Sequence, residues 1–168
     1  ISCETAQRVS DLLNFNVSQI RKESDGHWYL DLVQKKTKQP NTIYLTPTVR
    51  KILNKREGDF PNKISDQHYN EHIKEISKIA GLTKKEKGSK MVKVAKKTYR
   101  KVTGMYPKWE LVTSKIGRKS FASNYYGKIP TSLLIAQTGH STEKMFRVYM
   151  GISDSEHSKQ LGKAIRSL

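Results

Sequence analysis

A histidine and a tyrosine near the C-terminal end of the sequence are of types that could take part in chemistry. His140 precedes Tyr149 by nine residues in the stretch TGHSTEKMFRVYMG, which also holds Gly139 and Gly151. A tyrosine hydroxyl is a nucleophile once it is activated, and a histidine changes its charge near neutral pH. An aromatic side chain packed on a helix would look the same in this stretch, so both interpretations are open at this point.

Cations on segments with a helical pattern are a second group of candidates. Arg8 lies about one helical turn before Asp11, and Lys115 lies three residues before Arg118 in SKIGRKSFAS. Residues three apart share a helix face. Because helix N-termini favour anions, two cations there would strengthen an anion site. The alternative for each cation is an ordinary position on the surface.

The net charge indicates a polyanionic partner. The chain of 168 residues has a formal net charge of +17 and a pI near 9.9. Such an excess repels itself in a compact fold unless an anion neutralises it, so nucleic acid is the leading partner and an anionic membrane surface the second. A merely soluble basic protein is the third interpretation.

The compartment is expected to be reducing and cytoplasmic. Cys3 is the only cysteine, which excludes an intrachain disulfide and a cysteine-based metal site. No apolar run is long enough to span a bilayer, and nothing at the start has the pattern of a signal peptide.

The segment between Thr83 and Trp109 holds ten Lys or Arg residues and a single acid, Glu86. Gly88-Ser89 and Thr103-Gly104 have the composition of turns, which predicts a loose hairpin lying along phosphates. A solvated, partly disordered lysine loop is the alternative. The candidate DNA-binding residues are Lys93, Lys96, Lys97, Arg100 and Lys101.

Helical and alternating patterns predict an α+β fold that is mostly helical with a small sheet, in a single domain over residues 1–168. Asp25-Gly26 is expected to form a turn, Asp66 to cap one helix and Ser141 another. The expected strands are 28–34 and 42–45, joined by 35–41, and the expected helices are 5–15, 47–54, 66–80, 113–126, 130–139, 141–150 and 153–168.

Four stretches occur in order along the chain: TAQRVSD, QKKTKQPNTIYL, SKIGRKSFAS and TGHSTEKMFRVY. This ordered set resembles the tyrosine recombinases, the integrases of phages and transposons. Their pattern is an Arg in a T-G-x-R-x-S-[DE] helix, a Lys before Thr in a β-hairpin, H-x-x-R at a helix start, then L-G-H and a Tyr. The sequence from Gly117 to Gly151 is most similar to integrases of conjugative or mobilisable transposons of Bacteroides-like bacteria.

The resemblance implies the tyrosine recombinase catalytic-domain fold, α+β with a small antiparallel sheet, without the family's N-terminal core-binding domain. Asp11 matches the acid that supports the first arginine. Lys115 stands where most members have His, and Lys35 is the alternative to its neighbour Lys36. The implied catalytic residues are Arg8, Lys36, Lys115, Arg118, His140 and the nucleophile Tyr149.

The implied reaction is site-specific recombination of double-stranded DNA through a covalent 3′-phosphotyrosyl intermediate. The arginines would stabilise charge on the non-bridging oxygens, Lys36 would protonate the leaving 5′-oxygen, and His140 would hydrogen-bond a non-bridging oxygen. Lys115 would be either a base or a phosphate contact. No metal or other cofactor is expected.

In the family the protein acts as a homotetramer on DNA, which implies association with the nucleoid. The C-terminal helix, 153–168, with Leu161, Ile165 and Leu168 on one face, would contact a neighbouring subunit, or else its own core.

Three other functions fit parts of the pattern. A type IB topoisomerase shares the chemistry, an inactive integrase-derived protein would keep only DNA binding, and an unrelated basic nucleic-acid-binding protein would have neither cleavage nor a site. The last alternative is favoured if the fold holds the candidate residues far apart. The residues whose mutual distances decide between these functions are Arg8, Lys115, Arg118, His140 and Tyr149.

Overall fold

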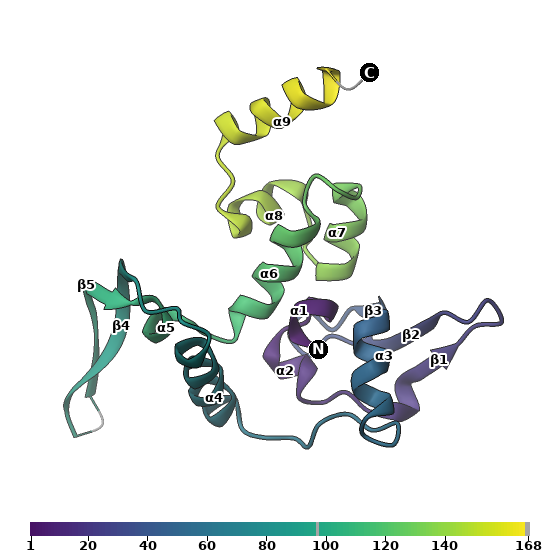
Figure 1. The fold of residues 1–168 in the computed structure, drawn as a ribbon, viewed down its shortest axis with the longest axis horizontal. Helices are drawn as coiled ribbons and strands as arrows, with labels where there is room; N and C mark the ends of the chain where they lie inside the picture. The colour runs from purple at the N-terminus through teal and green to yellow at the C-terminus, as the bar shows by residue number, and fades with distance from the viewer. Residues whose placement is uncertain (97, 167–168) are drawn as a thin grey trace. The chain divides into compact units, whose positions relative to one another are not determined.

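The computed structural model describes residues 1–96 and 98–166. It has an α+β architecture with more helix than strand and two small antiparallel sheets, as predicted (Figure 1). The chain divides into two compact units, one formed by Ile1–Lys63 with the segment from Gly117 onward, the other by Ile64–Ile116. Within the described residues, no helix combines the length and the apolar character needed to cross a membrane.

The first unit begins with two one-turn helices, α1 (Ser2–Thr5) and α2 (Val9–Leu12). The predicted continuous helix over 5–15 is therefore wrong. Ala6 ends α1 in the left-handed conformation, with φ of 59°, and Arg8 is extended. The break lets the Gln7 side chain turn inward, where it is fully buried and bonded to the Thr5 and Gln137 carbonyls.

A three-stranded antiparallel sheet follows, in the order β1 (Ile20–Lys22), β2 (Trp28–Val33) and β3 (Pro40–Tyr44). The two predicted strands are confirmed, although β3 begins at Pro40, inside the predicted connection 35–41. Strand β1, which alternation did not indicate, pairs with β2 across the predicted Asp25-Gly26 turn. Gly26 has φ of 81°, a conformation that glycine adopts without steric cost.

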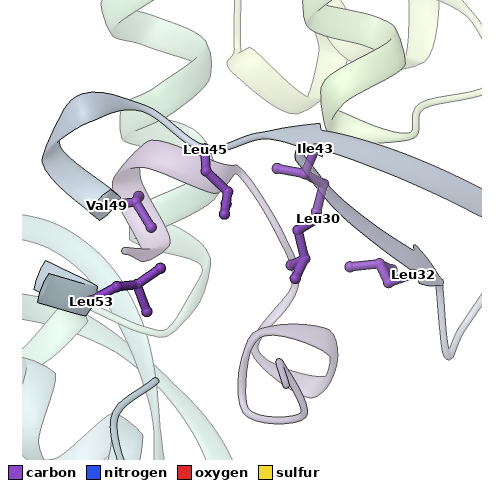
Figure 2. Close-up of a cluster of buried hydrophobic side chains, with 6 residues drawn as sticks. All are labelled: Leu30, Leu32, Ile43, Leu45, Val49 and Leu53. Atoms are coloured by element: carbon purple, nitrogen blue, oxygen red, sulfur yellow. The ribbon is translucent and has the colours of Figure 1, made fainter. Parts of the chain in front are cut away.

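The sheet carries the first core on one face. Alternate residues of β2 point inward, and α3 (Pro47–Asn54) covers them, beginning at its predicted proline. Figure 2 shows the side chains of the strands and of α3 directed toward one another. The cluster consists of Leu30, Leu32, Ile43, Leu45, Val49 and Leu53.

Helices α6 (Lys115–Tyr125), α7 (Thr131–Thr138) and α8 (Glu143–Met150) form around the second core, followed by α9 (Asp154–Arg166). Their predicted positions are confirmed, but the N-cap of α8 is Thr142 rather than Ser141, because the Thr142 hydroxyl accepts the Met145 N–H. The core side chains are Ala6, Phe121, Ala122, Leu134 and Phe146.

The second unit consists of α4 (Asp66–Ile79), a hairpin of β4 (Lys85–Ala95) and β5 (Thr98–Pro107), and the short helix α5 (Lys108–Leu111). The N-cap of α4 is Ser65, one residue before the predicted Asp66. The predicted hairpin is confirmed, but its two predicted turns are wrong.

Gly88 pairs with Gly104 in the middle of the ladder. A Cβ on Gly88 would lie 2.5 Å from a Leu111 methyl carbon. The glycine therefore leaves room for the Leu111 side chain to pack against the hairpin.

Candidate functional site

Three predicted site residues form a contact cluster in the first unit. The guanidinium carbon of Arg118 lies 5.7 Å from the ring centre of Tyr149, and the His140 ring centre lies 5.0 Å from the same point. Arg118 comes from α6, His140 follows the left-handed Gly139 that ends α7, and Tyr149 lies on α8. The spacing noticed in the sequence therefore corresponds to real proximity.

Arg118 is the buried cation of this cluster, with 5% of its surface exposed. Its Nη1 donates to the Ala6 carbonyl at 3.4 Å, which ties α6 to the break between α1 and α2. Burial, reinforced by the charge of Arg8, lowers the pKa of Arg118 to about 10, while Tyr149 and Asp11 oppose the shift. At neutral pH the side chain is still a cation, and one that little water screens.

Tyr149 is half-buried, and burial raises the pKa of its phenol. Arg118 and Arg8 act in the opposite direction because both favour the phenolate. Lys119 adds a third positive charge, with its Nζ 5.6 Å from the ring centre. A phenolate formed at Tyr149 would therefore be stabilised by positive charge close to its ring.

His140 is held neutral and in one orientation. Burial and the charges of Arg118 and Arg8 lower the pKa of His140 to about 4. Its Nδ1 lies 2.8 Å from the Thr138 hydroxyl, which itself lies 2.6 Å from the Leu134 carbonyl. Two acceptors at such a distance would repel, so the hydroxyl proton belongs to the carbonyl contact. Nδ1 then carries the imidazole proton and donates it to Thr138, which leaves Nε2 as an acceptor.

Arg8 is the second arginine of the site. It occupies the N-cap position of α2, is partly buried, and its Nη1 donates to Gln34 Oε1 at 3.1 Å. Arg8 is close enough to Arg118, His140 and Tyr149 to shift the pKa of each. Four of the five deciding residues therefore lie within electrostatic reach of one another in the first unit.

Asp11 fixes the turn between β2 and β3. It is 5% exposed, and its Oδ1 accepts the backbone N–H of Lys35 at 2.8 Å. Its charge also favours the cationic form of Arg118. Its predicted support of Arg8 stays a prediction.

Lys36 lies in the same turn, with an exposed side chain. The strand ends at Val33, so Lys35 and Lys36 are turn residues and do not alternate between the two faces of a strand. Thr37 closes the turn, because its hydroxyl donates to Gln34 Oε1 at 2.8 Å. Lys115 is the first residue of α6, three residues before Arg118.

Sequence reasoning missed a buried polar network beside these residues. Gln34 Nε2 donates to Gln7 Oε1 at 3.3 Å, and Gln7 in turn donates to the Gln137 carbonyl at 2.8 Å. Asn41 donates to the same carbonyl at 3.4 Å. Gln7 and Gln34 lie in two of the quoted stretches, directly before Arg8 and two residues before Lys36, but the family pattern names no glutamine at either position.

The hairpin of the second unit has two different faces. Cross-strand partners share a face, and one face meets α5: Gly88 lies against Leu111, Lys90 bonds Glu110, and Glu86 pairs with Lys108 at 3.1 Å. We call the opposite side the open face. Its exposed residues are Lys85, Lys87, Met91, Lys93, Tyr99, Lys101, Thr103 and Met105.

Both acids near the hairpin are therefore paired on the α5 side, while the described side chains of the open face include four lysines and no acid. Of the predicted DNA-binding residues, Lys93 and Lys101 belong to the open face, and Arg100 to the other. Lys96 lies in the exposed turn, and Lys97 lies outside the described residues.

The predicted contact helix at the C-terminus is α9, whose Leu161 and Ile165 are 60% and 59% exposed. Leu168, the third residue of the predicted apolar face, lies outside the described residues. Packing of this face on its own core, one of the two predicted alternatives, is not seen for these two side chains.

No known family model matches the chain, and no curated protein matches it significantly. Solved recombinases share its fold. XerH site-specific recombinase bound to difH substrate, in a pre-cleavage complex, superimposes with a TM-score of 0.59 at 15% identity over 94% of this chain and 42% of that one. Its post-cleavage complex with palindromic difH gives the same values.

XerA recombinase superimposes with a TM-score of 0.64 at 14% identity, over 97% of this chain and 55% of its own. The chain thus spans about half the length of these proteins. At this level of identity the likeness establishes architecture. The chain has the α+β fold of tyrosine recombinase catalytic domains.

Proposed function

We propose that the chain is the catalytic domain of a tyrosine-type site-specific recombinase that cleaves and rejoins double-stranded DNA. The observation that carries this proposal is the closeness of the Tyr149 ring to both the buried cation of Arg118 and the neutral imidazole of His140. A tyrosine packed for stability alone needs neither group. The likeness to XerH site-specific recombinase, bound to its difH substrate before cleavage and after it, supports the same function.

In the proposed reaction the Tyr149 oxygen attacks the scissile phosphorus while the bond to the 5′-oxygen breaks. The product is a 3′-phosphotyrosyl bond and a free 5′-hydroxyl, and the reverse reaction with another strand completes the exchange. Because the phosphodiester's energy is retained in the new bond, the cycle requires no external energy source. No metal or other cofactor takes part in the proposal.

The arginines stabilise the transition state. Arg118 and Arg8 carry permanent charges on planar groups that can bind two phosphate oxygens each. Their partial burial strengthens this interaction, because fixed charges act more strongly where water is excluded. Burial and, after it, repulsion from Arg8 lower the pKa of Arg118, and an incoming phosphate anion would offset that repulsion.

Proton transfer involves the remaining groups. His140 Nε2 is an acceptor in the orientation that Thr138 imposes, so it can take the phenol proton and afterwards, as an imidazolium, hydrogen-bond a non-bridging oxygen. Lys36 protonates the leaving 5′-oxygen from the exposed turn. Lys115 contributes a phosphate contact or a second base.

We further propose that both units belong to one catalytic domain over 1–168 and that the open face of the hairpin lies along the DNA backbone. α9 would contact a neighbouring subunit of a homotetramer through Leu161 and Ile165, whose exposure suits such a role. Integration of a conjugative or mobilisable element, and association with the nucleoid, follow from the resemblance of the sequence.

Covalent capture tests the proposed function. The protein is incubated with a mixed-sequence library of nicked duplexes, denatured with detergent and separated from free DNA. We expect a protein–DNA adduct from the wild type and none from Tyr149→Phe, which keeps the ring and its packing. Binding without an adduct would indicate an inactive DNA-binding relative. A separate assay on supercoiled DNA distinguishes a topoisomerase, which would relax the DNA without exchanging strands.

A further inference from the structure

The Gln34 side chain contacts both the Arg8 guanidinium and the turn that carries Lys36. It follows β2 and is 2% exposed. Burying an amide without hydrogen-bond partners costs free energy. The partners of the Gln34 amide therefore indicate which groups it positions. Resting on the proposed function, we propose that Gln34 is a positioning residue that fixes Arg8 and the Lys36 turn relative to each other.

The acceptor side of Gln34 joins the two groups. Its Oε1 accepts from Arg8 Nη1 at 3.1 Å and from the Thr37 hydroxyl at 2.8 Å. Both donors use the same oxygen, so a displacement of either one changes the bond to the other. The backbone of Gln34 adds a second restraint, because its carbonyl accepts the Lys38 N–H at 2.8 Å across the turn.

The donor side of Gln34 anchors the amide. Nε2 donates to Gln7 Oε1, which fixes which end of the amide is the oxygen and therefore faces Arg8. Gln7 is itself held by the carbonyls of Thr5 and Gln137. The acceptor that Arg8 meets is thus fixed through two successive side chains to the end of α7.

Gly139 closes the pocket around the amide. A Cβ at this position would lie 2.5 Å from Gln34 Nε2 and 2.9 Å from Oε1. Gly139 directly precedes His140, so the amide also lies against the loop that presents the imidazole. One buried amide therefore contacts the segments that carry Arg8, Lys36 and His140.

The consequence for Arg8 is geometric. A guanidinium has five N–H donors in one plane, and fixing one of them sets the direction of the rest. A neutral amide does this without cancelling the positive charge, which a carboxylate at the same place would do. Gln34 thus orients Arg8 and leaves its charge available for a phosphate.

A double-mutant cycle tests this assignment. Gln34→Met keeps the length and apolar contacts and removes the acceptor. We expect it to slow single-turnover adduct formation roughly ten- to a hundredfold, the range for removing a hydrogen bond to a charged group. In an Arg8→Met background the same change is expected to have little further effect, since residues acting through one another are not additive.

The control is Gln137→Met, which removes a side-chain donor to the Thr5 carbonyl but touches neither Arg8 nor Thr37. Its rate is expected to stay near that of the wild type. Equal decreases in rate from Gln34→Met with and without Arg8 would overturn the proposal, because the residue would then act through stability alone.

A second measurement keeps the test independent of cleavage. NMR of the arginine side chains reports whether the Arg8 N–H protons are protected from exchange in the protein without DNA. Protection in the wild type and in Gln137→Met, abolished in Gln34→Met and restored in Gln34→Glu, which keeps the acceptor, would support positioning even if the wild type formed no adduct. Arg8 signals that are the same in all four proteins would refute it.

Discussion

The His140 ring lies 5.0 Å from the Tyr149 ring, and its Nδ1 lies 2.8 Å from the Thr138 hydroxyl. The backbone places the His140 ring near Tyr149 as much as the side-chain contacts do. Thr138 is the last residue of α7, and Gly139 turns the chain in the left-handed conformation before His140. The imidazole therefore reaches Tyr149 from the end of one helix, while Tyr149 itself projects from the next.

The first prediction concerns the tautomer of His140. In the wild type we expect the neutral ring to carry its proton on Nδ1. Thr138→Val keeps the shape of the buried side chain but removes the acceptor, so the Nε2–H tautomer, usually favoured in water, should gain population. Long-range proton–nitrogen NMR distinguishes the two forms. A wild type with its proton on Nε2 would contradict the assignment.

The second prediction concerns pH and stability. The pKa of His140 is about 4 in the fold, against 6.5 as its ordinary value. The unfolded chain therefore binds this proton first, so the stability linked to His140 is complete above pH 6.5 and is lost as the pH falls toward 4. His140→Gln should have a shallower decrease of Tm across this window than the wild type.

Arg8→Met provides a second arm of the same measurement. Arg8 is one of the charges that lower the pKa of His140, so its removal should raise that pKa and make the decrease smaller. Parallel Tm curves for the wild type, His140→Gln and Arg8→Met would show that His140 titrates as it does in the unfolded chain.

The third prediction compares two glycines with left-handed backbone. Gly127 has φ of 76° with open space around a built Cβ, whereas Gly139 has φ of 63° with Gln34 in the way. Gly127→Ala should cost about 1 kcal/mol for the conformation alone. Gly139→Ala should cost about 1–3 kcal/mol more, as overpacking does. Urea unfolding measures both, and equal costs would mean that Gln34 moves aside freely.

The fourth prediction concerns the open face of the hairpin. Replacing Lys85, Lys87, Lys93 and Lys101 with Gln should weaken binding to duplex DNA and reduce the salt dependence, by a slope of roughly 0.9 for each phosphate that is no longer neutralised. Lys108→Gln is the matched control, because this lysine pairs with Glu86 on the other face. The measurement is the affinity for duplex DNA as a function of salt concentration. A similar loss of affinity per replaced lysine on both faces would argue against DNA binding by the open face.

The sequence predicted those parts of the molecule in which a local pattern and the final structure agree. The resemblance of the ordered stretches predicted a common site for Arg118, His140 and Tyr149, and the structure brings these side chains together. Arg118 and Tyr149 lie on the predicted helices α6 and α8, and His140 follows the glycine that ends α7. The strands around Leu30 and Ile43 followed from alternation.

The misses occurred where a distant contact determined the structure. The pattern from Thr5 to Phe15 is helical, but the burial of Gln7 against the end of α7 breaks it. Gly88 has the composition of a turn, but Leu111 needs the space beside it, so the hairpin continues through that position. Gln34 opens the stretch QKKTKQPNTIYL, but the family pattern names no glutamine there, and its proposed importance lies in the three segments that it contacts.

The bond between Asp11 and the turn has a consequence for how the sequence can change. Asp11 binds the backbone N–H at position 35, and the lysine side chain there takes no part in that bond. Every residue type except proline supplies the same donor. Position 35 can therefore vary in evolution without moving the turn. The side chain at position 35 can therefore change to suit the binding partner of the turn, while the backbone conformation of the turn stays the same.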